Sequence, residues 1–138
     1  MAVRNILLDT NAYAAFKRDV PDAVEIIRHA PSIIINSIVL GELLAGFASG
    51  TREAANRQEL KRFFDSDRVK LFSVDDDTAE YYAMVYRNLR SKGQPIPTND
   101  MWIAATALQH GLAVFTYDGH FNAVDGIIVG NHLSDFIQ

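Results

Sequence analysis

The chain has 138 residues, of which 49% are hydrophobic and 22% are charged. These values are ordinary for a globular protein and exclude a disordered tail, a collagen-like repeat and a bundle of membrane helices. Thirteen Lys and Arg against seventeen Asp and Glu give a net charge of -4, which does not indicate nucleic-acid binding through the overall field. The sequence has no cysteine, which excludes disulfides, cysteine-based metal sites and a thiol nucleophile.

The first half of the chain alternates short apolar runs, typical of buried strands, with stretches whose apolar residues recur at helical spacing. We expect strands at 3–8 and 32–36, and helices from near residue 12, at 21–30, at 38–48 and at 51–64. Thr10 and Asn11 are suited to cap the first helix and Ser37 the third, because their side chains accept hydrogen bonds from free helix amides.

The second half continues the alternation. We expect a strand at 69–74, a helix from the acidic run 75–77 through residue 89, a break at 93–97, a helix capped by Thr98 or Asn99 and ending at 110–111, and strands at 112–116 and 127–129. Strands that alternate with helices predict an α/β fold with a central, mainly parallel sheet of about five strands and helices on both faces. No linker or composition shift divides the chain, so a single domain over 1–138 is expected.

The hydrophobic segments do not indicate export or membrane insertion. The apolar run at 3–8 is too short for the core of a signal peptide, and the longest apolar tract, 33–48, is interrupted by polar residues and glycine. We therefore expect a soluble, cytoplasmic protein with no membrane partner.

Four of the seventeen acids are not explained as surface or capping groups. Glu42 is the only charge in an otherwise apolar helix that we expect to be buried, where an isolated carboxylate is costly. Asp100 shares a helix face with apolar residues three, four and seven positions on. Asp9 and Asp118 lie just past the carboxyl ends of predicted strands, the edge at which open α/β sheets bind ligands.

These four acids could face one crevice, because strand ends and helix starts meet at the same edge of a parallel sheet. Their mutual repulsion would force protonation unless a cation lies among them. Four oxygen ligands without a His or Cys partner favour Mg²⁺ or Mn²⁺ over zinc. Such an ion lowers the pKa of bound water toward about 7 and stabilises the charge of a phosphodiester under in-line attack, so no other nucleophile is needed.

Four segments of the chain together resemble, in order, the four motifs of the PIN domain family, and within it the VapC-type toxins of bacterial toxin–antitoxin operons. The resemblance covers nearly the whole chain and rests on Leu-Leu-Asp-Thr-Asn at 7–11, Ser-Ile-Val-Leu-Gly-Glu-Leu at 37–43, Pro-Thr-Asn-Asp-Met-Trp-Ile-Ala-Ala at 97–105 and Thr-Tyr-Asp-Gly-His-Phe at 116–121.

The resemblance implies a Mg²⁺- or Mn²⁺-dependent endoribonuclease that holds one or two ions. It assigns the acidic quartet to Asp9, Glu42, Asp100 and Asp118, with Asp9 and Asp100 as direct metal ligands and the other two bound directly or through water. Two polar residues, Asn11 and Thr116, match positions that orient the acids, the metal-bound water or the scissile phosphate. The resemblance also implies a homodimer, a tRNA or ribosomal RNA substrate, and a small VapB-type antitoxin whose C-terminal segment blocks the acidic pocket.

Several alternatives remain open from the sequence. A catalytically silent PIN-like module that binds RNA or protein would keep the fold without turnover, whereas a phospho-accepting receiver module is disfavoured because the chain has no late strand-end lysine. His120 is either an ordinary loop residue or a contact to substrate phosphate, and Asn99 is either a site residue or only a helix cap. An apolar stripe is interpreted as core or subunit interface rather than a base-stacking surface, at Tyr81, Tyr82, Val85, Tyr86 and Leu89. Two basic segments, 52–70 and 87–92, are either phosphate contacts or solvated helix faces.

Overall fold

The computed structural model describes residues 2–138. Over this range the chain forms five strands, six α-helices and two short 3-10 helices. In chain order these are β1 (Ile6–Leu8), α1 (Thr10–Lys17), α2 (Pro21–His29), β2 (Ile33–Asn36), α3 (Ser37–Ala48), α4 (Glu53–Phe64), β3 (Val69–Phe72), α5 (Asp76–Lys92), α6 (Thr98–His110), β4 (Ala113–Phe115), η1 (Gly119–Ala123), β5 (Val129–Gly130) and η2 (Leu133–Phe136).

The five strands form one parallel sheet in the order β3-β2-β1-β4-β5, as the alternation of strands and helices predicts. β1 is central, with Ile6 paired to Ile33 on one side and to Ala113 on the other. Its three residues are fully buried, which explains why this strand reads as a continuous apolar run. Because all strands are parallel, their carboxyl ends meet at one edge of the sheet.

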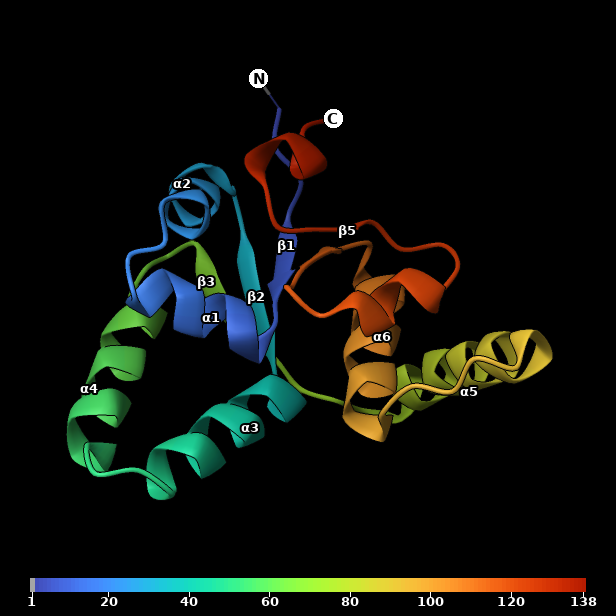
Figure 1. Cartoon of the computed structure of the whole chain (residues 1–138), viewed down its shortest axis with the longest axis horizontal. Coiled ribbons are helices and arrows are strands. Elements are labelled where there is room, and N and C mark those ends of the chain that lie inside the picture. Colours follow the sequence, from blue (N-terminus) through green and yellow to red (C-terminus); the bar gives the residue numbers. More distant parts are fainter. Residues whose placement is uncertain (1) are drawn as a thin grey trace.

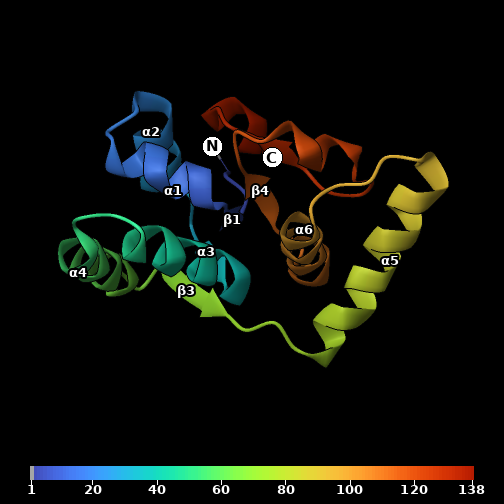
Figure 2. The same cartoon turned by 60° about the horizontal axis from the view of Figure 1, so that its bottom comes forward.

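The helices flank the sheet on both sides. α1 and α2 lie on one side, and α6 lies on the other, with α5 packed along the outside of α6 (Figures 1 and 2). The contact between α5 and α6 includes a stacked aromatic pair, Tyr82 and Trp102, with ring centroids 4.2 Å apart. None of the helices in residues 2–138 is long and apolar enough to cross a membrane.

Helix α3 corrects the expectation of a helix buried on all sides. It continues from the carboxyl end of β2 and extends beyond the sheet (Figure 1), so only Val39 and Leu43 are buried in it. Its apolar composition reflects a partly exposed face of small and aliphatic side chains. The consequence for Glu42 is partial exposure, where the sequence indicated a buried carboxylate.

Three predicted helix starts are also wrong in detail. α1 begins at Thr10 rather than near residue 12, because Asp9 itself is the N-cap. The N-cap of α3 is Asn36, whose Oδ1 accepts the amide of Val39 at 2.9 Å, so Ser37 is already helical. The N-cap of α6 is Pro97, which forms no side-chain cap hydrogen bond, so neither Thr98 nor Asn99 caps this helix.

The remaining differences concern element ends. α4 begins at residue 53, two residues later than expected. The strands predicted at 3–8, 32–36, 69–74 and 112–116 cover only 6–8, 33–36, 69–72 and 113–115, and the strand predicted at 127–129 lies at 129–130. The central strand β1 is the most affected, because Val3 forms only an isolated bridge, to Ile137. The order and type of the strands and α-helices are those expected, and the two 3-10 helices were not predicted.

Candidate active site

Asp9 lies at the carboxyl end of the central strand and is 4% exposed. Its Oδ1 accepts the backbone amide of Thr10 at 2.8 Å, and its Oδ2 accepts the hydroxyl of Thr116 at 2.7 Å. Burial raises the pKa of Asp9 from 3.8 to about 6, and the negative charges of Asp100 and Glu42 add to the rise, while the two hydrogen bonds oppose it. A carboxylate in this position is therefore poorly stabilised by its own surroundings.

Asp100 lies in the first turn of α6 and is 8% exposed. It turns toward the sheet edge as its helical phase predicts, and its Oδ2 lies 3.0 Å from Nδ1 of His120. Burial raises the pKa of Asp100, the nearby charges of Asp118 and Glu42 also raise it, and the hydrogen bond to His120 opposes them. This second buried acid therefore belongs to the same electrostatic group as Asp9.

Glu42 reaches the group from the second turn of α3 rather than from a helix start. Its Oε1 accepts the hydroxyl of Thr10 at 2.8 Å, and its Oε2 accepts the side-chain amide of Asn99 at 3.3 Å. Asn99 is thus a partner of the acidic group and not a helix cap. Both partners orient Glu42 toward Asp9 and Asp100, whose pKa values respond to its charge.

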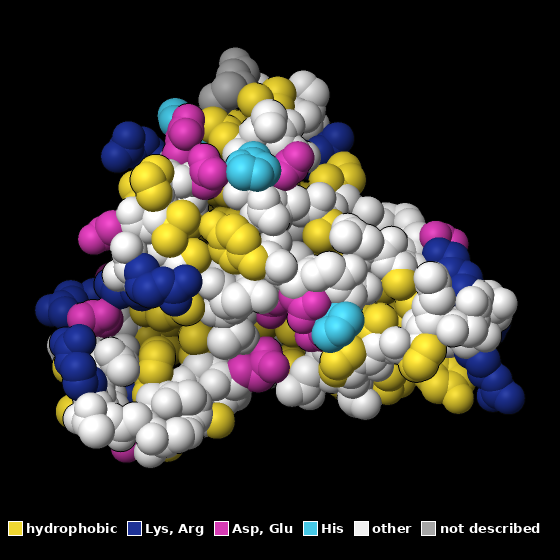
Figure 3. All heavy atoms as spheres, viewed as in Figure 1, with side chains coloured by type: hydrophobic (Ala, Val, Ile, Leu, Met, Phe, Trp, Pro, Cys, Tyr) yellow, Lys and Arg dark blue, Asp and Glu magenta, His cyan; other side chains and the backbone are white. Residues whose placement is uncertain are grey.

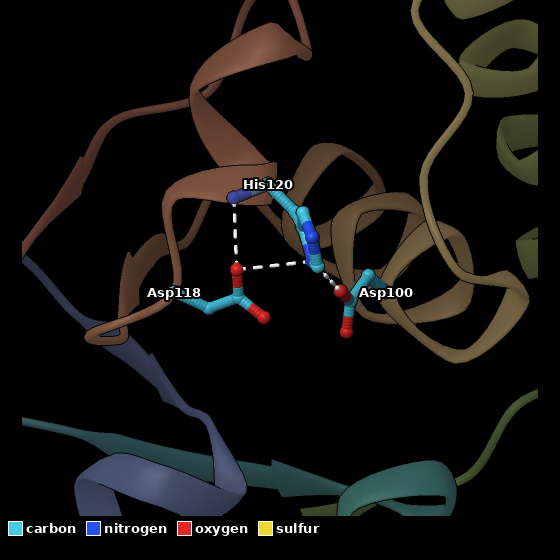
Figure 4. A group of neighbouring side chains, drawn as sticks. All are labelled: Asp100, Asp118 and His120. Carbon is cyan, nitrogen blue, oxygen red and sulfur yellow. Dashed lines mark hydrogen bonds and ion pairs between the residues drawn. The ribbon is translucent and has the colours of Figure 1, made fainter.

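Asp118 follows β4 and lies beside His120 (Figure 4). Its Oδ1 accepts the backbone amide of His120 at 2.9 Å and lies 3.0 Å from the Nδ1 of the same residue. His120 therefore places one ring nitrogen between two carboxylates, and its hydrogen bond to Asp100 raises its pKa. The sequence left open whether His120 belongs to the site. The spacing Asp-Gly-His could have indicated it, because an Asp side chain often accepts the backbone amide two residues later in a turn.

Asn11 and Thr116 fix the two loops that carry Asp9 and Asp118. The hydroxyl of Thr116 donates to Asp9 and accepts the backbone amide of Asp118 at 3.0 Å, so one side chain bridges both acids. Asn11 acts one step farther out, because its Oδ1 accepts the backbone amide of Tyr117 at 3.1 Å. Of these two polar residues, only Thr116 hydrogen-bonds an acid directly through its side chain.

The acidic group has no lysine or arginine counter-ion within the described residues. No Lys or Arg side chain of residues 2–138 forms an ion pair with any of the four acids, and His120 is their only basic neighbour. Acidic side chains and a histidine gather in the middle of the molecular face shown in Figure 3. Oxygen and nitrogen atoms of Asp100, Asp118 and His120 lie within 4.8 Å of one another, close enough to bind one ion.

The basic segments lie elsewhere and are partly used for structure. Arg68 donates through one guanidinium nitrogen to the carbonyls of Ile27 and Ala30 at the end of α2. Lys92 pairs with Asp125, and Arg57 pairs with Glu53 on the same helix. These three residues stabilise the fold or lie on solvated faces, and none of them pairs with the four acids.

The stripe along α5 is largely a packing surface, as expected. Val85 and Leu89 are buried, and Tyr82 stacks on Trp102. Met84 and Tyr86 instead remain 52% and 48% exposed. The stripe thus joins α5 to α6 and leaves Tyr86 at the surface, together with Met84, which is on the same helix but outside the stripe.

Comparison with known proteins agrees with this geometry. The sequence matches the PIN domain family over residues 6–127. The chain is 33% identical over 133 residues to Ribonuclease VapC4 of Mycobacterium tuberculosis, covering 94% of this chain and 98% of the relative. It is 30% identical over 122 residues to Ribonuclease VapC5 of the same organism, covering 87% of each.

A solved structure gives the same result at the level of the fold. The DNA-bound VapBC complex of Salmonella typhimurium contains a chain that superposes with a TM-score of 0.80 at 25% identity, over 92% of this chain and 97% of that chain. The matched segment spans all four acids, from the first strand to beyond β4. The chain therefore belongs to the PIN domain family and, within it, to the group of the VapC ribonucleases.

Proposed function

We propose that this protein is an endoribonuclease that requires Mg²⁺ or Mn²⁺ and hydrolyses RNA phosphodiester bonds. The observation that carries the proposal is the group of Asp9, Glu42, Asp100 and Asp118, which interact with one another at the carboxyl edge of the sheet without a Lys or Arg partner in residues 2–138. The similarity to proteins named as ribonucleases supports the same reaction.

The residues fit a hard divalent cation. All four acids offer carboxylate oxygens, the ligands that Mg²⁺ and Mn²⁺ prefer. The pKa values of Asp9 and Asp100 are raised mainly by burial, and the charges of the neighbouring acids add to the rise. A bound cation would favour the ionised form of both groups, which is the opposite of what burial does.

In this proposal Asp9 and Asp100 hold the ion directly, and Glu42 and Asp118 bind it directly or through water. When bound, one or two such ions lower the pKa of a water molecule and stabilise charge on the phosphate during in-line attack. The hydroxyl of Thr116 joins the carboxylate of Asp9 to the backbone amide of Asp118, and so fixes the two acidic residues relative to each other.

Glu42 is held by partners from two different helices. Thr10 and Asn99 donate to its two carboxylate oxygens, so the side chain points into the group although it is partly exposed. These two hydrogen bonds hold α1, α3 and α6 together around the acidic group. This preorganisation is what a phosphoryl-transfer site requires, because positioning and electrostatics supply most of its rate enhancement.

The decisive experiment is RNA cleavage by a site variant and a matched control. We expect Asp100→Asn to reduce Mn²⁺-dependent cleavage of total RNA by more than about 100-fold. Even the replacement of a residue that only hydrogen-bonds a metal ligand typically lowers metal affinity or activity by about 10- to 100-fold. Asp67→Asn, an exposed acid in the turn before β3, is the control and retains wild-type activity. Cleavage that persists in a folded Asp100→Asn variant, or that survives EDTA, contradicts the proposal. A wild-type chain that binds RNA without metal-dependent products favours a silent binding module.

We infer in addition that a VapB-type antitoxin controls the site. The similar Salmonella typhimurium structure is a VapBC complex, which supports a partner of this kind. A groove beside Glu42 offers a surface for a peptide segment; it is formed by α1, α3 and α4 and lined by Tyr13, Lys17, Phe47 and Glu59. A basic side chain entering from this groove would neutralise the acidic group.

A homodimer and a cytoplasmic location belong to the same proposal. The exposed Met84 and Tyr86 on α5 are the surface we assign to a second copy, because large apolar side chains are enriched in subunit interfaces. The solution mass of the purified chain is then twice that of the monomer. The substrate class remains tRNA or ribosomal RNA, as the family resemblance implies.

A further inference from the structure

His120 places a ring nitrogen between two of the four acids. Its Nδ1 lies 3.0 Å from Oδ2 of Asp100 and 3.0 Å from Oδ1 of Asp118 (Figure 4). The sequence predicted a metal site made only of the four carboxylates, without a histidine partner. The structure brings the histidine and two acids together from η1, α6 and the loop after β4.

The position of His120 is held by the backbone on both sides. Its amide donates to Asp118 at 2.9 Å, and the next residue, Phe121, is fully buried in the core. The imidazole is half exposed, so ions and water can reach it from solvent. A side chain with a fixed backbone and an accessible ring is suited to bind a ligand at this point.

The separations are those of hydrogen bonds, and they also bring the three groups close enough to share one ion. Both nitrogen–oxygen distances at His120 are 3.0 Å, which is an ordinary hydrogen-bond length. One ligand atom from each of Asp100, Asp118 and His120 lies within 4.8 Å of the other two. A divalent ion that enters this space would therefore meet two carboxylate oxygens and one imidazole nitrogen.

We infer that Nδ1 of His120 is a nitrogen ligand of the divalent metal, next to Asp100 and Asp118, and that it shifts the site from Mg²⁺ toward Mn²⁺. This inference rests on the proposed function, because it concerns the same metal. Mg²⁺ takes oxygen ligands almost exclusively, whereas imidazole favours the later first-row ions. The histidine would therefore set which of the two ions the enzyme uses.

A competing role would give the opposite result. A protonated His120 could hold the two carboxylates together as an internal cation, and a metal would then have to displace it. Removing the imidazole would strengthen metal binding in that case and weaken it if Nδ1 is a ligand. The direction of the change in Mn²⁺ affinity therefore distinguishes the two roles.

The experiment measures Mn²⁺ binding by the purified full chain, using the electron paramagnetic resonance signal of the free ion, with Mg²⁺ as competitor. We expect His120→Ala to weaken Mn²⁺ binding at least about tenfold and to change Mg²⁺ binding less. His120→Asn, which puts an amide oxygen near the position of Nδ1, should recover part of the Mn²⁺ affinity and lower the preference for Mn²⁺ over Mg²⁺. His132→Ala is the control, because Nδ1 of His132 also lies 3.0 Å from one carboxylate, that of Asp22.

A second readout detects the nitrogen itself. Pulsed electron paramagnetic resonance of bound Mn²⁺ should show coupling to a ¹⁴N nucleus in the wild type and in His132→Ala, and none in His120→Ala or His120→Asn. Mn²⁺ binding and RNA cleavage without this coupling, or tighter binding by His120→Ala, overturn the role of His120 and leave the proposed function intact. A wild type that neither binds Mn²⁺ nor cleaves RNA overturns both.

Discussion

Replacing Asp9 by Asn should stabilise the metal-free protein at neutral pH while removing a proposed metal ligand. Asp9 is 4% exposed, and its pKa is raised to about 6, mainly by burial. A carboxyl group with this shift binds its proton more tightly in the folded chain than in the unfolded one. Its contribution to stability is therefore complete below pH 3.8 and is lost as the pH rises through about 6.

The magnitude follows from the two pKa values. The difference between 3.8 and about 6 corresponds to about 3 kcal/mol, at about 1.4 kcal/mol per pKa unit. The amide that replaces the carboxylate in Asp9→Asn carries no charge but keeps only one of the two acceptor oxygens that now bind Thr10 and Thr116, which costs about 1 kcal/mol. We expect Asp9→Asn to be more stable than the wild type by about 2 kcal/mol at pH 8 and less stable by about 1 kcal/mol at pH 3.5.

Urea denaturation in EDTA between pH 3.5 and 8 measures this difference directly. The exposed variant Asp67→Asn serves as the control and should follow the wild-type curve. Adding Mn²⁺ at about 100 times its dissociation constant should stabilise the wild type by about 2.7 kcal/mol and the Asp9→Asn variant by much less. A difference between wild type and Asp9→Asn that stays constant across this pH range would refute the assignment of buried charge to Asp9.

Two further variants test the supports of the site. Thr116→Val removes the hydroxyl donor to Asp9, so the pKa of Asp9 should rise further. Mn²⁺ binding should then weaken more at pH 6.5 than at pH 8.5, and an equal loss at both pH values would argue against this hydrogen bond. Asn36→Ala removes the cap of α3 and a buried amide that donates to Thr106 at 2.9 Å, and we expect the free energy of unfolding to fall by about 2–3 kcal/mol in urea denaturation. The exposed Asn5→Ala should change it by less than about 0.5 kcal/mol, and a similarly small effect at Asn36 would contradict the role of this network.

The fold was predictable because its signals are local. Buried parallel strands read as apolar runs such as Ile6–Leu8, and amphipathic helices read as 3.6-residue patterns, so the order and type of the elements follow from the chain itself. Helix starts were less predictable, because Thr10, Asn11 and Ser37 are as suitable for capping as the residues that do it, Asp9 and Asn36. The choice among neighbouring caps depends on where the preceding strand ends, which is set by its partners in the sheet.

The exposure and the hydrogen-bond partners of Glu42 could not be predicted from the sequence. The apolar composition of α3 indicated a buried helix, yet the helix extends beyond the sheet and leaves Glu42 partly exposed. Composition reports how apolar a segment is but not how much of it a neighbour covers. The two donors that hold Glu42, Thr10 and Asn99, lie 32 and 57 residues away in the sequence.

The sequence by itself determined the α/β architecture and was enough to propose the four acids, because strand ends, helix phase and charge in apolar surroundings are properties of short segments. Only the tertiary structure decided how these acids are arranged: Thr116 bridges Asp9 and Asp118, and His120 lies between Asp100 and Asp118. Such contacts depend on the register of the strands and on the rotation of helices about their axes. These quantities are fixed by packing across the whole core, and no local pattern encodes them.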